Sequence, residues 1–209
     1  MHDELKKIQN MKVVPVLAIP DAADAGPVAE ALVAGGLPCA EVTFRTGAAV
    51  ESIRAMAKRG DMVVGAGTVL TTEQVDAAVD AGATFIVSPG TNPKTVEYCL
   101  KKGVLVTPGV ATPSDIETAM SLGLRTLKFF PAETLGGLPA LKAISAPYSM
   151  CTFIPTGGVN PGNLVEYLKF PPVIACGGTW LVKKEFIAEK QFDRIAELSR
   201  EAVAIAAGA

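Results

Sequence analysis

Residues 126–133 read TLKFFPAE, a short apolar and aromatic run with one lysine, Lys128, near its centre. Such a run predicts a strand of a parallel sheet, which is buried on both faces. Burial disfavours the charged form of a lysine, and the neutral amine is a nucleophile that forms a Schiff base with a ketone. The alternative is that Lys128 reaches the surface from the strand end or pairs with a buried carboxylate. The stretch therefore predicts a buried strand and makes Lys128 a candidate catalytic residue.

Further apolar runs of the same kind recur on both sides of this stretch. The runs begin near residues 13, 39, 62, 85, 105, 126, 152 and 173, so that successive starts lie 20 to 26 residues apart. Strands that alternate with helical segments at this spacing predict βα units and a parallel sheet. Eight such units predict one α/β domain over residues 1–209, a single (β/α)8 TIM barrel with a short extra helix over residues 2–11. A doubly wound open sheet is the alternative.

The positions of the polar residues favour the closed barrel over the open sheet. Polar or special residues stand at the C-terminal ends of nearly all of the runs, namely Thr43, Arg45, Thr68, Ser88, Pro89, Thr107, Pro108, Glu133, Thr156 and Thr179. Active sites of (β/α)8 barrels are built at that end, from several strands at once.

Helix-start signals occupy the segments between the runs. Asn92-Pro93, Thr112-Pro113 and Asn160-Pro161 each place a capping side chain before a proline at the first helical position. Thr71 together with Gln74 resembles a capping box. We therefore expect helices to begin at these four places.

Composition and charge exclude several classes of function. Apolar residues make up 49% of the chain and the net charge is −2, which argues against nucleic-acid binding because such binding leaves a basic footprint. No run approaches eighteen uninterrupted apolar residues, so we expect no membrane span. The first ten residues lack an apolar core before a cleavage site, so we expect no secretory signal.

The cysteines and the single histidine limit the chemistry. The four cysteines have no C-x-x-C spacing and lie mostly in apolar runs, which is typical of reduced core thiols in a cytoplasmic protein. His2, the only histidine, stands in a tail that we expect to fray. A histidine-based metal site or a histidine general base is therefore not expected, and chemistry must come from lysine, carboxylates, hydroxyls and backbone.

The second run places two charged residues on one face of a strand. In AEVTFRT, residues 40–46, the alternation of a strand puts Glu41, Thr43 and Arg45 on one face and apolar residues on the other. If this face and that of Lys128 both point inward, Glu41, Arg45 and Lys128 converge on one cavity. The alternative is a rim ion pair, which fits poorly with a buried parallel sheet.

The last two runs predict an anion site. PTGGVNPGN, residues 155–163, and ACGGTW, residues 175–180, each place paired glycines directly after a strand. Glycine allows backbone N–H groups to approach an anion closely, and barrels frequently bind phosphate at these two loops. The expected donors are the backbone near Gly157, Gly158, Gly177 and Gly178 and the Thr179 hydroxyl.

Taken together, these motifs resemble one known enzyme family. EVTFRT, VGAGTV, SPG, TPGV, KFFPAE, PTGGV and GGTW occur in this order over residues 12–205. This set is similar to the 2-keto-3-deoxy-6-phosphogluconate (KDPG) aldolase family, whose members often also act as 4-hydroxy-2-oxoglutarate (KHG) aldolases. The resemblance implies a (β/α)8 barrel, a class I lyase of the Entner-Doudoroff pathway without metal or other cofactor, a cytoplasmic location and a homotrimer.

The family motifs imply roles for the residues that carry them. Lys128 would form the Schiff base and Glu41 would be the general acid/base. Arg45 and Thr68 would hold the carboxylate of the pyruvate half of the substrate, and Pro89 would line that pocket.

The remaining implied contacts concern the reacting carbons and the phosphate. Thr156 would lie near the reacting carbons, and the phosphate would be held by Gly157, Gly158, Gly178 and Thr179. Thr179 stands where relatives often carry serine, so the hydroxyl is kept but its added methyl could tighten or tilt the phosphate contact.

The implied reaction cleaves KDPG to pyruvate and glyceraldehyde 3-phosphate, and KHG to pyruvate and glyoxylate. The alternative within this chemistry is a pyruvate-dependent aldolase with another aldehyde or epimer, such as 2-keto-3-deoxy-6-phosphogalactonate. The same scaffold would also suit a phosphosugar isomerase or synthase, or a non-catalytic protein that binds a phosphorylated keto acid.

Overall fold

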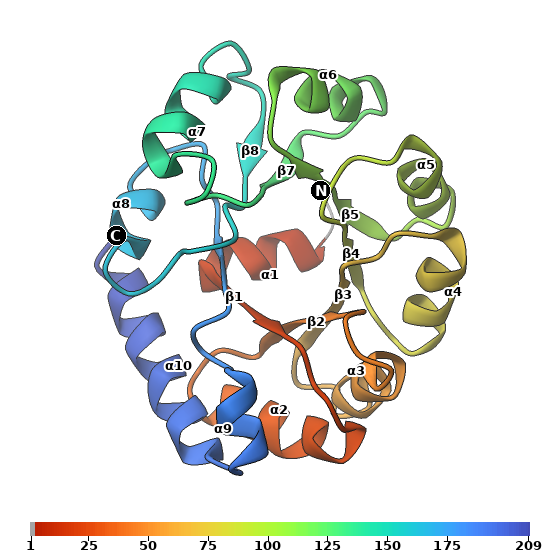
Figure 1. Cartoon of the computed structure of the whole chain (residues 1–209), viewed down its shortest axis with the longest axis vertical. Coiled ribbons are helices and arrows are strands. Elements are labelled where there is room, and N and C mark those ends of the chain that lie inside the picture. Colours follow the sequence, from red (N-terminus) through yellow and green to blue (C-terminus); the bar gives the residue numbers. More distant parts are fainter. Residues whose placement is uncertain (1–2) are drawn as a thin grey trace.

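Parallel strands form the centre of the molecule and helices surround them (Figure 1). The computed structural model describes residues 3–209, so His2 and its predicted fraying lie outside the described residues. The strands are β1 (Val13–Leu17), β2 (Cys39–Thr43), β3 (Val63–Gly67), β4 (Phe85–Val87), β5 (Leu105–Thr107), β6 (Gly109–Val110), β7 (Thr126–Phe129), β8 (Thr152–Phe153) and β9 (Cys176–Gly178). The helices are α1 (Asp3–Met11), the 3₁₀ helix η1 (Ala22–Asp24), α2 (Ala25–Ala34), α3 (Ala49–Ala57), α4 (Thr72–Asp80), α5 (Pro93–Lys101), α6 (Pro113–Ser121), α7 (Gly137–Ser145), α8 (Leu164–Leu168), α9 (Lys184–Ala188) and α10 (Phe192–Ala207).

The strands pair in two parallel sheets. Six strands form a half-barrel in the order β5-β4-β3-β2-β1-β9, and three form a second sheet in the order β6-β7-β8. β5 and β6 belong to one apolar run, in which Pro108 separates them, so this run contacts both sheets. Bridges from Phe153 to Val173 and from Thr156 to Gly177 connect the runs of β8 and β9. The predicted α/β class with a parallel sheet is confirmed.

Three of the four predicted helix starts are confirmed by their caps. The side chains of Thr71, Asn92 and Thr112 accept hydrogen bonds from the first turns of α4, α5 and α6, and Thr112 forms a full capping box with Asp115. The start at Asn160-Pro161 is wrong. The Asn160 side chain bonds the carbonyl of Gly158 and the N–H of Gly162 within a turn, and α8 begins only at Leu164.

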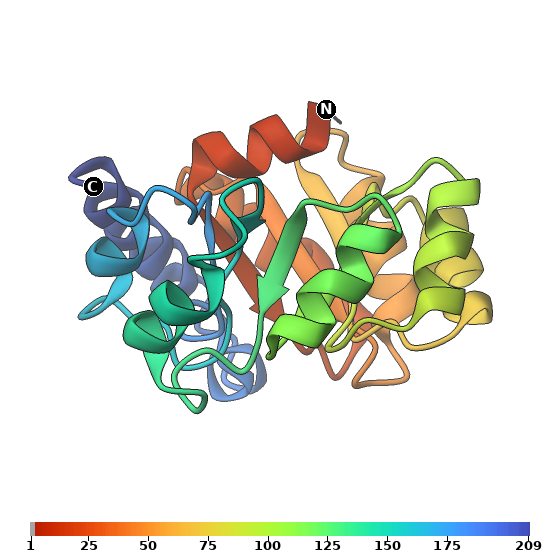
Figure 2. The same cartoon turned by 90° about the horizontal axis from the view of Figure 1, so that it is seen from above.

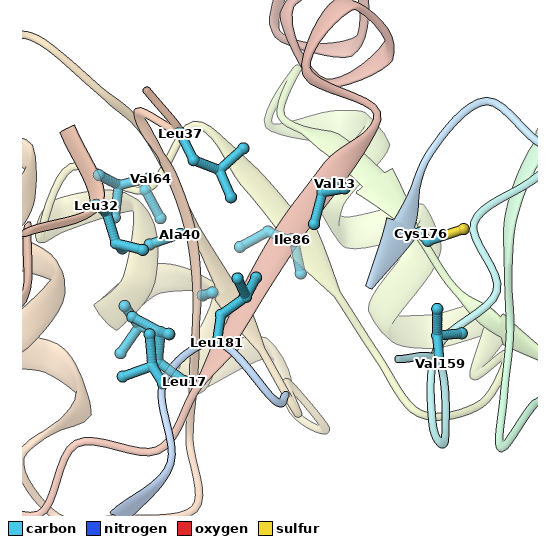
Figure 3. Packing of buried hydrophobic residues seen from close by; sticks show 14 of the residues in the cluster. Val13, Leu17, Leu32, Leu37, Ala40, Val64, Ile86, Val159, Cys176 and Leu181 are labelled. Carbon is cyan, nitrogen blue, oxygen red and sulfur yellow. The ribbon is translucent and has the colours of Figure 1, made fainter. Parts of the chain in front are cut away.

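Apolar side chains fill the space on both sides of the strands. Outward-facing residues pack against the helices, as Leu32 of α2 does with Ala40 and Val64 in the core shown in Figure 3. A second cluster fills the interior between the two sheets, which together we call the ring, with Val14, Phe85 and other inward-facing residues.

Helix α1 covers one end of the ring. It lies across the end from which the strands start, opposite their carboxyl ends (Figure 2). Its buried residues Leu5 and Ile8 belong to the inner cluster. The interior is therefore closed by apolar side chains at this end, and the carboxyl ends of the strands remain for a functional site. Among residues 3–209, no helix has both the length and the apolar character that crossing a membrane requires.

The four cysteines are buried and none forms a disulfide in the described chain. Burial raises the pKa of the Cys99 thiol to about 11, and it also raises the pKa values of Cys39 and Cys176. Because the thiolate is the reactive species, these thiols are doubly protected, by burial and by protonation.

We predict that Ellman's reagent at about pH 8, where an ordinary thiol is partly ionised, reacts with the native protein only over hours. Chain unfolded in guanidinium should react at once at all four thiols. Absorbance at the thionitrobenzoate maximum measures both rates. Immediate reaction of the native protein would show that the core opens freely and would contradict the packing described above.

Candidate active site

A buried ion pair occupies the inside of the ring. The Nζ of Lys128 on β7 lies 3.2 Å from the Oε1 of Glu41 on β2, although 87 residues separate them in the chain. Lys128 is 6% exposed and Glu41 is 4% exposed. Both side chains point inward because each stands at an inward position of the strand alternation. The structure therefore brings together the two residues predicted as nucleophile and acid/base.

Glycine makes room for the Glu41 carboxylate. A Cβ atom at Gly67 would lie only 2.2 Å from Glu41 Oε1, so any larger residue there would push the carboxylate aside. Gly67 ends β3, which pairs with β2 along its whole length. This role of Gly67 was not predicted from the sequence. The signal for it is a glycine within a strand, which often marks a close approach of another group.

The surroundings of the ion pair are mostly apolar. The cavity is lined on its polar side by Glu41, Lys128, Thr107 and Thr156, and on its apolar side by Ile8, Val14, Phe85, Val87 and Ile154. The ring of Phe130 lies beside the amine, with Nζ 5.1 Å from the ring centroid. In such a medium each charge depends on its partner, since an uncompensated buried charge is strongly destabilising.

Thr68 stands in a strained backbone conformation at the carboxyl end of β3, directly after Gly67. It follows β3 with a φ of 57°, which is an outlier for a β-branched residue. Such strain costs energy, persists only where the surroundings enforce it, and gathers at functional sites. Pro89 follows β4 at the same end of the ring, where the buried Ser88 hydroxyl donates to the carbonyl of Gly90.

Arg45 does not join the Lys128 cavity. It is exposed and lines a separate pocket at the mouth of the ring, together with Thr179 and Lys183. The expectation that Glu41, Arg45 and Lys128 converge on one cavity is therefore wrong for Arg45. The reason is that β2 ends at Thr43, so the strand alternation no longer fixes the direction of the Arg45 side chain. The pocket nevertheless places Arg45 beside a predicted phosphate ligand.

The first pair of predicted glycines lies in a loop with unpaired donors. We call residues 156–163 the glycine loop. Gly157 and Gly158 have φ values of 98° and 84°, which favour glycine. Within residues 3–209 the N–H groups of both glycines have no hydrogen-bond acceptor. Two adjacent free N–H groups at the carboxyl end of a strand can bind an anion.

The second pair of glycines differs from the prediction. Gly177 and Gly178 do not follow a strand but belong to β9, where they pair with Val14 and Pro15 of β1. A Cβ atom at Gly177 would lie 2.2 Å from Thr156 Oγ1, so this glycine makes room for a threonine of the cavity. Thr179 comes directly after the strand and is exposed.

The amine and the carboxylate, the two groups that Schiff-base chemistry uses, share a cavity with Thr156, the first residue of the glycine loop. A protein-family model described as KDPG and KHG aldolase matches residues 5–198. The chain belongs to the KDPG and KHG aldolase family. The resemblance predicted from the sequence motifs is confirmed, and the chain is accordingly an aldolase, a carbon–carbon lyase.

Named relatives match nearly the whole chain. The 2-dehydro-3-deoxy-phosphogluconate aldolase of Treponema pallidum is 45% identical over 95% of both chains. The KHG/KDPG aldolase of Escherichia coli K12 is 44% identical over 91% of this chain and 90% of its own.

Solved structures of family members superimpose closely. KDPG aldolase of Legionella pneumophila, with pyruvate captured as a covalent carbinolamine intermediate, has a TM-score of 0.92 and 38% identity, covering 96% of this chain and 98% of its own. The enzyme of Zymomonas mobilis with 3-phosphoglycerate has a TM-score of 0.89 and 42% identity, covering 96% and 95%. A covalent pyruvate adduct in a family member agrees with Schiff-base chemistry.

The contact between Gly67 and Glu41 generates a prediction. Gly67→Ala should displace the carboxylate by about an ångström and lower kcat about 10²-fold, the usual cost of such a misplacement. Steady-state aldolase assays measure the change, and circular dichroism checks that the variant folds.

Gly26→Ala is the matched control, because a Cβ atom at this position of α2 would meet nothing within 4 Å. It should leave kcat unchanged and stabilise the helix slightly. Unchanged kcat in Gly67→Ala would mean that the position of the carboxylate does not matter.

Proposed function

We propose that this chain is a class I aldolase that cleaves KDPG to pyruvate and glyceraldehyde 3-phosphate, and KHG to pyruvate and glyoxylate. The single observation that carries the proposal is the buried contact between Lys128 Nζ and Glu41 Oε1 at 3.2 Å. Family membership and the covalent pyruvate intermediate of the Legionella relative support it. The relatives that support KDPG and KHG as substrates are 44–45% identical to this chain.

The first half of the reaction forms the covalent bond. Glu41 accepts a proton from Lys128, and the neutral amine attacks carbon 2 of the keto acid. The carbinolamine then loses its hydroxyl as water, with a proton returned by Glu41, and an iminium remains. The apolar cavity wall limits access of bulk water to this cation.

The second half breaks the carbon–carbon bond. Glu41 removes the proton of the carbon-4 hydroxyl, directly or through a water, and the electrons of the bond between carbons 3 and 4 move into the iminium to give an enamine. Glyceraldehyde 3-phosphate leaves. Protonation of the enamine at carbon 3 and hydrolysis of the resulting iminium release pyruvate and restore the free amine. The atoms and electrons of the reaction therefore balance without a redox cofactor or a metal.

The proposed binding roles follow the positions of the remaining residues. Thr68 holds the carboxylate of the pyruvate half together with Arg45, whose exposed side chain turns inward from its pocket at the mouth of the ring when substrate binds. Pro89 lines the carboxylate pocket, and Thr156 contacts the reacting carbons. The strained backbone of Thr68 and the place of Thr156 in the wall of the Lys128 cavity support these roles. The phosphate is held by Gly157, Gly158, Gly178 and Thr179, and the free N–H groups of the glycine loop support that site.

We also propose that residues 1–209 form a single closed (β/α)8 barrel. The bridges between the runs of β8 and β9, and the shared run of β5 and β6, support closure of the two sheets into one ring. In this arrangement α1 is the extra helix. The homotrimer and the cytoplasmic location remain predictions from the family.

The Schiff base is tested by trapping. With pyruvate and borohydride, the wild-type chain should gain the mass of a reduced pyruvate adduct on Lys128, located by peptide mass spectrometry. Lys128→Met should give no adduct and no cleavage, because no other buried amine lines the cavity in the described chain. Lys94→Met, at an exposed lysine of α5, should behave as wild type. More than a few per cent of wild-type activity in Lys128→Met would refute the proposal.

The acid/base role is tested by Glu41→Gln, which keeps the shape of the side chain. Because positioned acid/base groups contribute about 10²–10⁴-fold, kcat for KDPG cleavage should fall by about that range. Exchange of pyruvate methyl protons with solvent, followed by NMR, should slow as well. A loss of less than about tenfold would assign proton transfer to another group.

A further inference from the structure

A hydrogen bond connects two elements on either side of the glycine loop. The hydroxyl of Tyr167, on α8, donates to Glu133 Oε1 at 2.5 Å. Glu133 follows β7 on the same run as Lys128, while Tyr167 follows the glycine loop and is only 1% exposed. Neither residue lines the cavity around Lys128. The proposed reaction uses neither Glu133 nor Tyr167.

Glu133 also contacts the glycine loop directly, through its backbone N–H and the aliphatic part of its side chain. Its N–H donates to the carbonyl of Gly157 at 3.0 Å, next to the bond from Ala132 to Thr156. A Cβ atom at Gly158 would lie 2.5 Å from Cβ and Cγ of Glu133, so the carboxylate-bearing stem packs directly on the Gly158 backbone.

The other side of the loop is fixed by amides. The carbonyl of Gly158 accepts from the Nδ2 atoms of Asn160 and Asn163, at 2.9 and 3.3 Å. Both glycine carbonyls are therefore engaged by the protein, while neither N–H group has an acceptor among residues 3–209. Two consecutive glycines have the most backbone freedom to lose, so a loop held in this way has already lost the entropy that ligand binding would otherwise cost.

The carboxylate itself has to be kept from the bound anion. An ionised Glu133 next to a phosphate site would repel the ligand, and the Tyr167 hydroxyl directs its Oε1 toward α8 instead. Burial, followed by the hydrogen bond to Glu133, raises the pKa of Tyr167 above its ordinary value. The hydroxyl therefore stays protonated, and remains a donor, at neutral pH.

We propose that Glu133 and Tyr167 are positioning residues that hold the N–H groups of Gly157 and Gly158 toward the phosphate, so that they select phosphorylated over unphosphorylated substrates. The proposal rests on the proposed function, because it assigns the phosphate of the substrate to the glycine loop. Glu133 and Tyr167 would affect the choice of substrate and not bond cleavage, since Glu133 contacts the glycine loop and neither residue lines the Lys128 cavity.

Tyr167→Phe tests the pair with the smallest change. Loss of a hydrogen bond to a charged group should raise KM for KDPG about tenfold with kcat nearly unchanged. The kcat/KM for KHG, which has no phosphate, should change by less than about twofold. Calorimetric titration with 3-phosphoglycerate should show the same tenfold loss of affinity without any turnover.

Two substitutions of Glu133 separate positioning from charge. Glu133→Gln keeps an oxygen that accepts from Tyr167 and removes the negative charge, so KM for KDPG should stay at or below the wild-type value. Glu133→Ala removes both the stem and the acceptor, and KM for KDPG should rise about tenfold. If the side chain acted only by repelling phosphate, both variants would lower KM equally, and the proposal would fall.

Tyr98→Phe is the matched control. It removes a tyrosine–carboxylate hydrogen bond of the same kind, to Asp76, between α5 and α4 on the outside of the ring. Its KM for KDPG and its affinity for 3-phosphoglycerate should both equal the wild-type values.

The outcomes distinguish this inference from the proposed function. Equal losses for KDPG and KHG in Tyr167→Phe and Glu133→Ala, or unchanged affinity for 3-phosphoglycerate, would overturn the positioning role while the aldolase assignment stands. Absence of a pyruvate adduct on Lys128 would overturn the aldolase assignment itself, and titration with 3-phosphoglycerate would still report on the glycine loop. If Tyr167→Phe fails to fold, Glu133→Ala at an exposed position carries the same comparison.

Discussion

The arrangement of this molecule depends on one buried contact between an amine and a carboxylate. Taking either charge out of water alone costs several kcal/mol, and their mutual attraction offsets this only when the two groups meet in a suitable geometry. Lys128 and Glu41 meet at 3.2 Å because β7 and β2 both direct an inward residue to the same level of the ring. A slip of either strand by one residue would point its charge at the helices. The register of the strands is thus tied to the ion pair.

Apolar side chains close one end of the interior that holds the ion pair, so the site can open only toward the other end. Leu5 and Ile8 of α1, with Phe85 and other inward residues, fill the end of the ring where the strands begin. The side chains of α1 therefore close this end of the interior, and the carboxyl ends of the strands, where Thr68, Thr179 and the glycine loop stand, are left for substrate. The same packing that stabilises the ring interior would limit hydration of the cationic intermediate that we propose on Lys128. Stability and chemistry use the same side chains here.

The sequence was informative wherever a strand fixed the direction of a side chain. Lys128 and Glu41 could be placed by the alternation of their strands, and three helix starts by their caps. Arg45 could not be placed, because it stands beyond the end of β2. Asn160 looked like a cap but closes a turn within its own loop, since its side chain finds partners two residues away on either side. The Gly177–Gly178 pair looked like a loop because pairing with β1 is not visible in local sequence. Likewise, the contact of Gly67 with Glu41 depends on the register between two strands.

The two halves of the site are built by different means, and this has a consequence for specificity. The amine, the carboxylate and Thr156 stand on or next to strands whose register is fixed by pairing on both sides, so small changes there disturb the ring itself. The glycine loop is held by the backbone N–H of Glu133 and by the side chains of Asn160 and Asn163, and Tyr167 acts on the loop only through the Glu133 carboxylate. With the phosphate assigned to the glycine loop as we propose, substitutions in this second set alter which aldehyde is accepted and leave the Lys128 cavity intact, because the two sets share only the backbone of Thr156 and Gly157.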